Sequence, residues 1–86
     1  MQQVTVYTTP SCVQCNATKR QFDKLGVPYD AIDLTQHPEL TDQFKELGLI
    51  QAPIVVVGEG VEATRWSGFR LEKIKKVANA YNVEQK

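Results

Sequence analysis

The stretch VTVYTTPSCVQC, residues 4–15, decides the fold. Its first five residues, 4–8, are mainly β-branched or aromatic and predict a strand, which residues 9–11 (TPS) break. The residues from Cys12 to Leu25 favour a helix, and Gly26 stands where a left-handed helix terminator belongs. One stripe of this helix is predicted to face inward, because four residues recur at helical spacing: Cys15, Thr18, Phe22 and Leu25.

The rest of the chain alternates strand and helix patterns. Apolar residues at helical spacing followed by glycine predict a helix, whereas β-branched runs predict strands. The run Ile54–Val57 is apolar throughout, which is typical of a strand buried on both faces. In chain order the elements are a strand at 29–34, a helix that opens at 35–38 and stops at Gly48, a strand at 54–57, a turn at 58–60, a strand at 61–66, a loop at 67–69 and a helix at 70–81.

The resulting order is β-α-β-α-β-β-α, which is an α/β arrangement. A strand, a helix and a second strand at the start imply a parallel pair with a right-handed crossover, and the later hairpin implies an antiparallel pair. The sequence therefore predicts one mixed four-stranded sheet flanked by three helices. A chain of 86 residues with no visible repeat or linker is expected to form a single domain, residues 1–86.

Composition excludes several classes of protein. The chain is 42% hydrophobic and 23% charged, and its ten basic residues balance ten acidic ones. A protein that binds nucleic acid through phosphates usually has a basic excess, so we expect no nucleic-acid partner. The longest purely apolar run, Ile54–Val57, is too short to span a bilayer, and Met1-Gln2-Gln3 does not resemble a signal peptide. We therefore expect a cytoplasmic protein without a membrane partner.

The chain has two cysteines, Cys12 and Cys15. A bridge between residues three apart constrains the unfolded chain little, so stabilisation is a poor reason for it. Cys12 is expected at the N-terminus of the first helix, where free amides and the helix dipole favour a thiolate. Such sites lower a cysteine pKa from about 8.5 into roughly the 3.5–7.5 range. Cys15 follows nearly one turn later and is expected to face back toward Cys12.

This pair suits thiol–disulfide exchange, in which the Cys12 thiolate attacks a substrate disulfide and Cys15 then releases the product. Other interpretations stay open. A closed zinc site wants four ligands, whereas the chain offers two cysteines and one histidine, His37, which is expected to end a loop. An iron–sulfur cluster would need thiolates from two chains, and two inert buried cysteines are the remaining alternative. A C-x-x-C beside a β-α-β pattern favours redox exchange, so we expect no metal.

Residues beside the cysteines are candidates for substrate binding. Val13 and Gln14 lie between the two cysteines and should be exposed, with Val13 as an apolar contact for a protein disulfide. Pro53 follows Ala52 and precedes the buried strand. If their peptide bond is cis, the Ala52 backbone is placed to pair with an extended substrate near the thiols. The alternative is an ordinary proline that begins a strand.

The segment from Trp66 to Arg70 reads W-S-G-F-R and places two large aromatic residues around small ones. Ser67 is a candidate to cap the last helix through its hydroxyl group, and Gly68 permits a backbone shape that other residues resist. Trp66 and Phe69 are interpreted either as a core aromatic pair or as a surface that faces a partner, with Arg70 beside them.

Together, T-x-P-x-C-V-Q-C, a proline before a buried strand and W-S-G-F-R resemble the glutaredoxin-like NrdH-redoxins, a branch of the thioredoxin superfamily. The similarity covers nearly the whole chain. The resemblance implies a thioredoxin fold in which Cys12 is the attacking thiol and Cys15 the resolving thiol of a redox-active disulfide. It also implies that Pro53 is a cis proline and that residues 66–70 shape partner recognition.

The resemblance further implies a role in electron transport. NrdH-redoxins donate electrons to the large subunit of class Ib ribonucleotide reductase, which supports deoxyribonucleotide synthesis, and receive them from NADPH through thioredoxin reductase. We expect a monomer. We also expect no tightly bound organic cofactor, because the sequence has no glycine-rich phosphate loop.

Differences from ordinary glutaredoxins bear on the choice of reductant. Those proteins resemble C-P-Y-C at the active site and carry a G-G-x-D stretch for glutathione, whereas this chain has Val13-Gln14 and a Ser67–Arg70 loop with no acidic residue. A glutathione site should therefore be weak, although a conventional glutaredoxin remains the alternative function. Thr9 and Leu71 replace a lysine and a proline that are common in the branch, and the first change could raise the Cys12 pKa. A binding module that does not use its thiols has only the aromatic loop in its favour.

Overall fold

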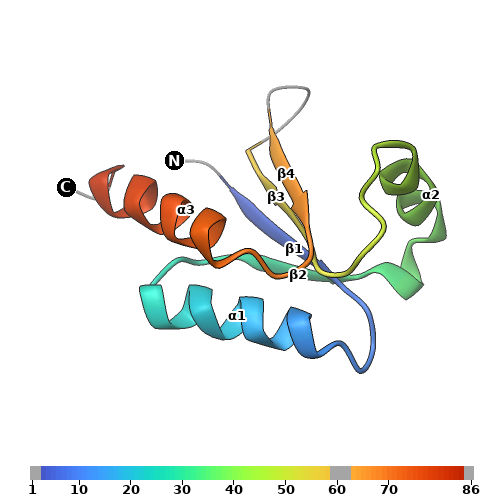
Figure 1. Ribbon diagram of the computed structural model, residues 1–86, viewed down its shortest axis with the longest axis horizontal. Helices are drawn as coiled ribbons and strands as arrows, with labels where there is room; N and C mark the ends of the chain where they lie inside the picture. The colour runs from blue at the N-terminus through green and yellow to red at the C-terminus, as the bar shows by residue number, and fades with distance from the viewer. Residues whose placement is uncertain (1–2, 59–62, 85–86) are drawn as a thin grey trace.

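The computed structural model describes residues 3–58 and 63–84 of the chain and has the predicted order of elements (Figure 1). A short 3-10 helix is added between the second strand and the second helix. Parts of the expected turn at 58–60 and strand at 61–66 lie outside the described residues. The elements are β1 (Val4–Thr8), α1 (Val13–Leu25), β2 (Asp30–Asp33), η1 (Leu34–Gln36), α2 (Pro38–Glu46), β3 (Ile54–Val57), β4 (Thr64–Ser67) and α3 (Leu71–Glu84).

The strands form one mixed sheet of four strands, as the sequence predicts, and the structure gives their order as β2-β1-β3-β4. Strand β1 is parallel to β2 and pairs Thr5 with Asp30. Strand β3 is antiparallel to both of its neighbours, and Val55 faces Val6 of β1 and Trp66 of β4. The arrangement is a thioredoxin fold, in which the first β-α-β unit gives the parallel pair β1–β2, the hairpin gives the antiparallel pair β3–β4, and β1 and β3 join the two pairs in antiparallel direction.

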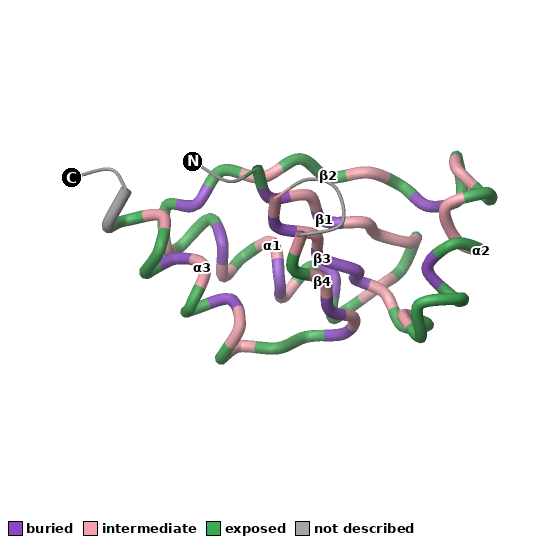
Figure 2. Tube along the Cα trace, turned by 90° about the horizontal axis from the view of Figure 1, so that it is seen from above, coloured by how far each residue is buried: buried purple, intermediate pink, exposed green. Residues whose placement is uncertain are grey.

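Two clusters of side chains cover the two faces of the sheet. On one face Val6 and Val55 pack with Phe22 of α1 and Ile74 of α3. On the other face Ile54 packs with a smaller set of residues from β1, η1 and α2. Figures 1 and 2 show α1 and α3 running close together while α2 stands at the opposite end of the molecule. Strand β3 therefore needs apolar side chains on both faces, which explains its unbroken apolar run.

The boundaries of α1 follow from local chemistry. Cys12 is the N-cap residue with an extended backbone, so the helix begins one residue later than the sequence pattern predicts. Thr18 and Phe22 are buried on the predicted inward stripe. Gly26 ends the helix with φ 74° and donates its amide hydrogen to the carbonyl of Phe22, which confirms the predicted left-handed terminator.

The largest difference from the predicted elements concerns Ser67. The sequence suggested that its hydroxyl caps the last helix, but Ser67 is the final residue of β4 and pairs with Ile54 of β3. Helix α3 begins only at Leu71, and the carbonyl of Arg70 accepts the amide hydrogen of Ile74. The predicted helix cap at Ser67 was therefore wrong, because pairing with β3 keeps Ser67 in the sheet, whereas α3 begins only at Leu71.

The remaining differences are at element ends. The second strand is shorter than predicted, because Asp33 turns the chain into η1 by accepting the amide hydrogen of Thr35 at 2.8 Å. Helix α2 begins at Pro38, whose fixed φ suits a first turn, and α3 continues to Glu84 rather than ending at Tyr81. No helix in the described ranges 3–58 and 63–84 is long and apolar enough to cross a bilayer.

Candidate active site

Cys12 and Cys15 form a disulfide at the start of α1, with 5.2 Å between their Cα atoms. The chain leaves β1, turns at residues 10–11 and enters the helix at Cys12. Cys12 is partly exposed, whereas only 1% of Cys15 is exposed. A partner can therefore reach the sulfur of Cys12 directly, and the sulfur of Cys15 only through it. This asymmetry fits the roles that the sequence predicts for the two thiols.

The sulfur of Cys12 lies in the amide environment of a helix N-terminus. The amide hydrogen of Cys15 is donated to Cys12 Sγ over 3.0 Å, so the sulfur occupies the position of an N-cap acceptor. The first turn of α1 contains no acidic residue that would oppose a negative charge there. After reduction the same amide and the positive end of the helix dipole favour the thiolate of Cys12 over the thiol.

The turn into the helix places Ser11 in a left-handed backbone conformation, with φ 57°. A residue with a side chain pays roughly 1–3 kcal/mol for this conformation, which glycine adopts freely. The strain is located directly before Cys12 and redirects the chain from β1 into α1. This left-handed conformation was not predictable from the sequence, because a serine after a proline indicates only a turn.

The peptide bond between Ala52 and Pro53 is cis, as the sequence predicts, and Pro53 is buried. The carbonyl of Pro53 accepts the amide hydrogen of Gly68 over 2.8 Å, which joins the start of β3 to the loop after β4. Pairing of the Ala52 backbone with a substrate stays a prediction, since a single chain does not test it.

The loop after β4 is also joined to the C-V-Q-C motif. Gln14 lies between the cysteines, and its side-chain oxygen accepts the amide hydrogen of Phe69 over 3.0 Å. A Cβ atom on Gly68 would lie 3.3 Å from Gln51 Oε1 and 3.4 Å from Gln14 Oε1. The structure thus brings three distant segments together around the disulfide: the C-V-Q-C motif, the Pro53 turn and the loop at 67–70.

The two aromatic residues of W-S-G-F-R have different roles. Trp66 is 4% exposed and packs in the larger core cluster, so for Trp66 the core interpretation is confirmed. Phe69 is 37% exposed and is not part of that core, so the two residues are not the core aromatic pair that was considered. Arg70 is exposed and lies 3.9 Å from the carboxylate of Glu72.

Three exposed apolar side chains belong to the segments that meet around the disulfide. Val13 is 78% exposed, Ile50 is 75% exposed, and Phe69 is the third. Ile50 directly precedes Gln51, the residue whose side chain approaches Gly68. We call these three residues the apolar rim. Val13 and Phe69 were predicted from the sequence, whereas Ile50 was missed, because in the sequence it is one of two apolar residues, Leu49 and Ile50, between the helix stop at Gly48 and the Pro53 turn.

The sequence raised the question of a metal site. Within residues 3–58 and 63–84, no group of three or more His, Cys, Asp or Glu side chains is arranged to hold a metal ion. His37 is the N-cap residue of α2, and its Nδ1 lies 3.5 Å from the Glu39 carboxylate. His37 is also the C-cap residue of η1, so it joins two helices where the sequence predicts the end of a loop.

Replacement of Gly68 by alanine should impair the site more than it impairs the fold. Gly68 has φ +79°, so the change costs about 1–2 kcal/mol, partly offset by a less flexible unfolded chain. The new methyl group also presses on the side chains of Gln14 and Gln51. Gly48→Ala is the matched control, because Gly48 has φ +80° and open space around it. Urea titrations should give similar losses for both variants, whereas disulfide reduction should slow only in Gly68→Ala; equal activities would contradict this.

Comparison with known proteins agrees with this geometry. The glutaredoxin family model matches residues 4–61. The glutaredoxin-like protein NrdH of Escherichia coli (strain K12) is 35% identical over 74 residues, which cover 86% of each chain. The protein of the same name from Lactococcus lactis subsp. lactis (strain IL1403) is 29% identical over 75 residues, covering 87% of this chain and 99% of that protein.

Solved structures lead to the same group. The structure of NrdH-redoxin from Escherichia coli, described as a glutaredoxin-like protein with a thioredoxin-like activity profile, superposes with a TM-score of 0.75 at 35% identity. The match covers 86% of this chain and 92% of that one. A glutaredoxin from Archaeoglobus fulgidus, at 22% identity and a TM-score of 0.69, shares the fold. The paired cysteines, the fold and these relatives together make the chain a thiol–disulfide oxidoreductase that belongs to the NrdH-redoxins, the glutaredoxin-like branch of the thioredoxin superfamily.

Proposed function

We propose that this NrdH-redoxin carries electrons from thioredoxin reductase to the large subunit of class Ib ribonucleotide reductase. NADPH is the source of the electrons, and this chain holds them as a pair of thiols rather than on a tightly bound cofactor. In this proposal the protein acts as a cytoplasmic monomer. The observation that carries it is the asymmetry of the disulfide, with Cys12 Sγ reachable at a helix N-terminus and Cys15 buried behind it.

The reaction transfers two electrons in two exchanges. The Cys12 thiolate attacks one sulfur of the acceptor disulfide, whose S–S bond breaks and whose other sulfur leaves as a thiolate that takes up a proton. Cys15 then loses its proton and attacks Cys12 Sγ, which breaks the mixed disulfide and releases the second acceptor thiol. The acceptor gains two electrons and two protons, and this chain returns to the Cys12–Cys15 disulfide. Thioredoxin reductase reverses the change by the same kind of exchange.

The surroundings of the disulfide support a protein partner over glutathione. The apolar rim offers exposed hydrocarbon surface on the segments beside Cys12, which suits a protein surface better than a small charged peptide. The loop at 67–70 has no carboxylate to bind the amino group of glutathione. The next acidic residue, Glu72, already lies beside Arg70. The alternative function is that of a glutathione-dependent glutaredoxin, which would accept electrons from glutathione rather than from thioredoxin reductase.

The choice of reductant is tested by comparing two coupled assays on one acceptor disulfide. We expect NADPH consumption with thioredoxin reductase to exceed that with glutathione and glutathione reductase at least tenfold, which is about 1.4 kcal/mol in the barrier. Oxidised class Ib ribonucleotide reductase large subunit is the second acceptor, and its activity should depend on this chain in the thioredoxin reductase system. Equal or faster turnover with glutathione would assign the chain to the alternative function.

A further inference from the structure

The side chain of Gln14 takes no part in the two exchanges, although it lies between the reacting cysteines. Gln14 is exposed, and its Oε1 accepts the amide hydrogen of Phe69 over 3.0 Å. Resting on the proposed function, in which the partner is a protein, we propose that Gln14 is a positioning residue. It acts through Phe69, because its hydrogen bond holds that part of the apolar rim beside the disulfide, ready for a protein to dock.

Phe69 depends on its backbone for its position. Its ring is 37% exposed and belongs to neither core cluster, so packing against the described core does not fix it. Two consecutive amides of the loop between β4 and α3 are held instead. The amide of Gly68 donates to the carbonyl of Pro53 over 2.8 Å, and that of Phe69 donates to Gln14. Only the second bond ends on a side chain, so a single substitution can remove it.

The other end of this bond is anchored in α1. The carbonyl of Gln14 accepts the hydroxyl hydrogen of Thr18, a fully buried residue, over 2.9 Å. A backbone amide can only donate, so Gln14 must present its side-chain oxygen to Phe69. Gln14 therefore joins the buried face of α1 to an exposed ring 55 positions later in the chain. Neither bond involves a sulfur atom, so the arrangement serves both the reductase, which meets the disulfide, and the acceptor, which meets the thiols.

A ring that is held in place before docking helps a protein partner more than a small disulfide. A partner that reaches Cys12 Sγ meets Val13 on the same turn and Phe69 tethered to the next residue, Gln14. Because the loop is already ordered, less conformational freedom is lost on binding. An interaction of this kind acts on association, so its removal should raise KM more than it lowers kcat.

Three variants test the hydrogen bond itself. Gln14→Met keeps the length of the side chain but lacks the oxygen, Gln14→Glu keeps an accepting oxygen, and Gln43→Met makes the first change at an exposed position of α2. The Phe69 amide should exchange with solvent about fivefold faster in Gln14→Met, as measured by solvent-exchange NMR. No faster exchange is expected in Gln14→Glu or Gln43→Met. Equal exchange in Gln14→Met and the unmodified chain would overturn the proposal.

A double-variant cycle tests whether Gln14 acts through Phe69. We expect Gln14→Met to raise the KM for thioredoxin reductase about fivefold, with a smaller effect on kcat. The KM for insulin, whose disulfides the chain reduces while dithiothreitol regenerates its thiols, should rise equally. In a Phe69→Ala background the same change should raise either KM by less than about twofold, because the ring that Gln14 positions is gone. Gln43→Met should match its parent in both backgrounds.

The insulin assay keeps the test independent of the physiological reductase. An unmodified chain that reduces insulin but is not turned over by thioredoxin reductase would refute the proposed function, and the KM for insulin would then decide the role of Gln14. Equal rises in KM with and without Phe69 would mean that Gln14 contacts the partner itself. That result would overturn the positioning role, as would a KM that Gln14→Met leaves unaltered.

Discussion

Replacing Cys15 by serine is expected to trap the protein in a covalent complex with its acceptor. Cys12 remains at the N-cap of α1, where the residue 15 amide still donates to its sulfur, so the first exchange proceeds. The second exchange needs a thiol at position 15, and a serine hydroxyl does not displace a thiolate. Turnover should fall to the uncatalysed background while a mixed disulfide accumulates, visible by non-reducing gel and by mass.

The reciprocal variant distinguishes the two roles. Cys12→Ser removes the sulfur that a partner can reach and should give neither turnover nor a trapped complex, because Cys15 is buried. Cys15→Ala serves as a second form of the first variant, in case a buried hydroxyl group destabilises α1. Accumulation of the mixed disulfide with Cys12→Ser rather than with the Cys15 variants would exchange the assigned roles.

Replacing Phe22 by alanine is expected to remove about 3–5 kcal/mol of the free energy of unfolding. Phe22 is fully buried and lies on the stripe by which α1 packs on the sheet. The total free energy of unfolding of a small domain is roughly 5–15 kcal/mol, so the variant should be close to unfolding near body temperature. The loss is measured as a lower urea midpoint with an unchanged slope.

Phe69→Ala is the matched control, because it removes the same atoms from a side chain that is 37% exposed. Its free energy of unfolding should fall by less than about 1 kcal/mol, whereas its KM for the protein reductase should rise, since Phe69 belongs to the apolar rim. A loss of stability in Phe69→Ala as large as that in Phe22→Ala would contradict the division between core and rim.

The elements of the fold were predictable because local patterns and tertiary packing agree. The stripe on α1, the glycine at its end and the apolar run of β3 each appear as a short-range signal in the sequence. Ser67 is the instructive exception. Serine is a common helix cap, yet cross-strand pairing with Ile54 decided its position, and pairing between residues far apart in the chain leaves no local trace.

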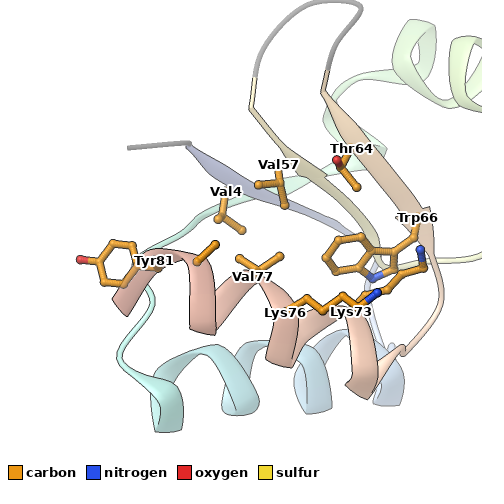
Figure 3. A pocket seen from close by; sticks show the side chains of 9 residues that line it. Val4, Val57, Thr64, Trp66, Lys73, Lys76, Val77 and Tyr81 are labelled. Atoms are coloured by element: carbon orange, nitrogen blue, oxygen red, sulfur yellow. The ribbon is translucent and has the colours of Figure 1, made fainter. Parts of the chain in front are cut away.

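The same limit applies to the site. Cys12 and Cys15 were identified because their spacing alone carries the chemistry. The bond from Phe69 to Gln14 joins residues 55 positions apart, and it depends on the fold having formed. The pocket between α3 and the sheet likewise combines β1, near the start of the described chain, with α3, near its end (Figure 3). Neither could be predicted from the order of residues.

The place of β3 in the sheet sets the order in which the site is completed during synthesis. Both cysteines are made early, but the strand beside β1 and the turn at Pro53 are made only in the second half of the chain. A nascent polypeptide that ends before this point already carries the reactive sulfurs, yet lacks Gly68, Phe69 and everything that they hold in place. The two sulfurs are therefore in place before the segments that flank them, and the surface by which the site meets a partner is complete only once the C-terminal part of the chain has been made.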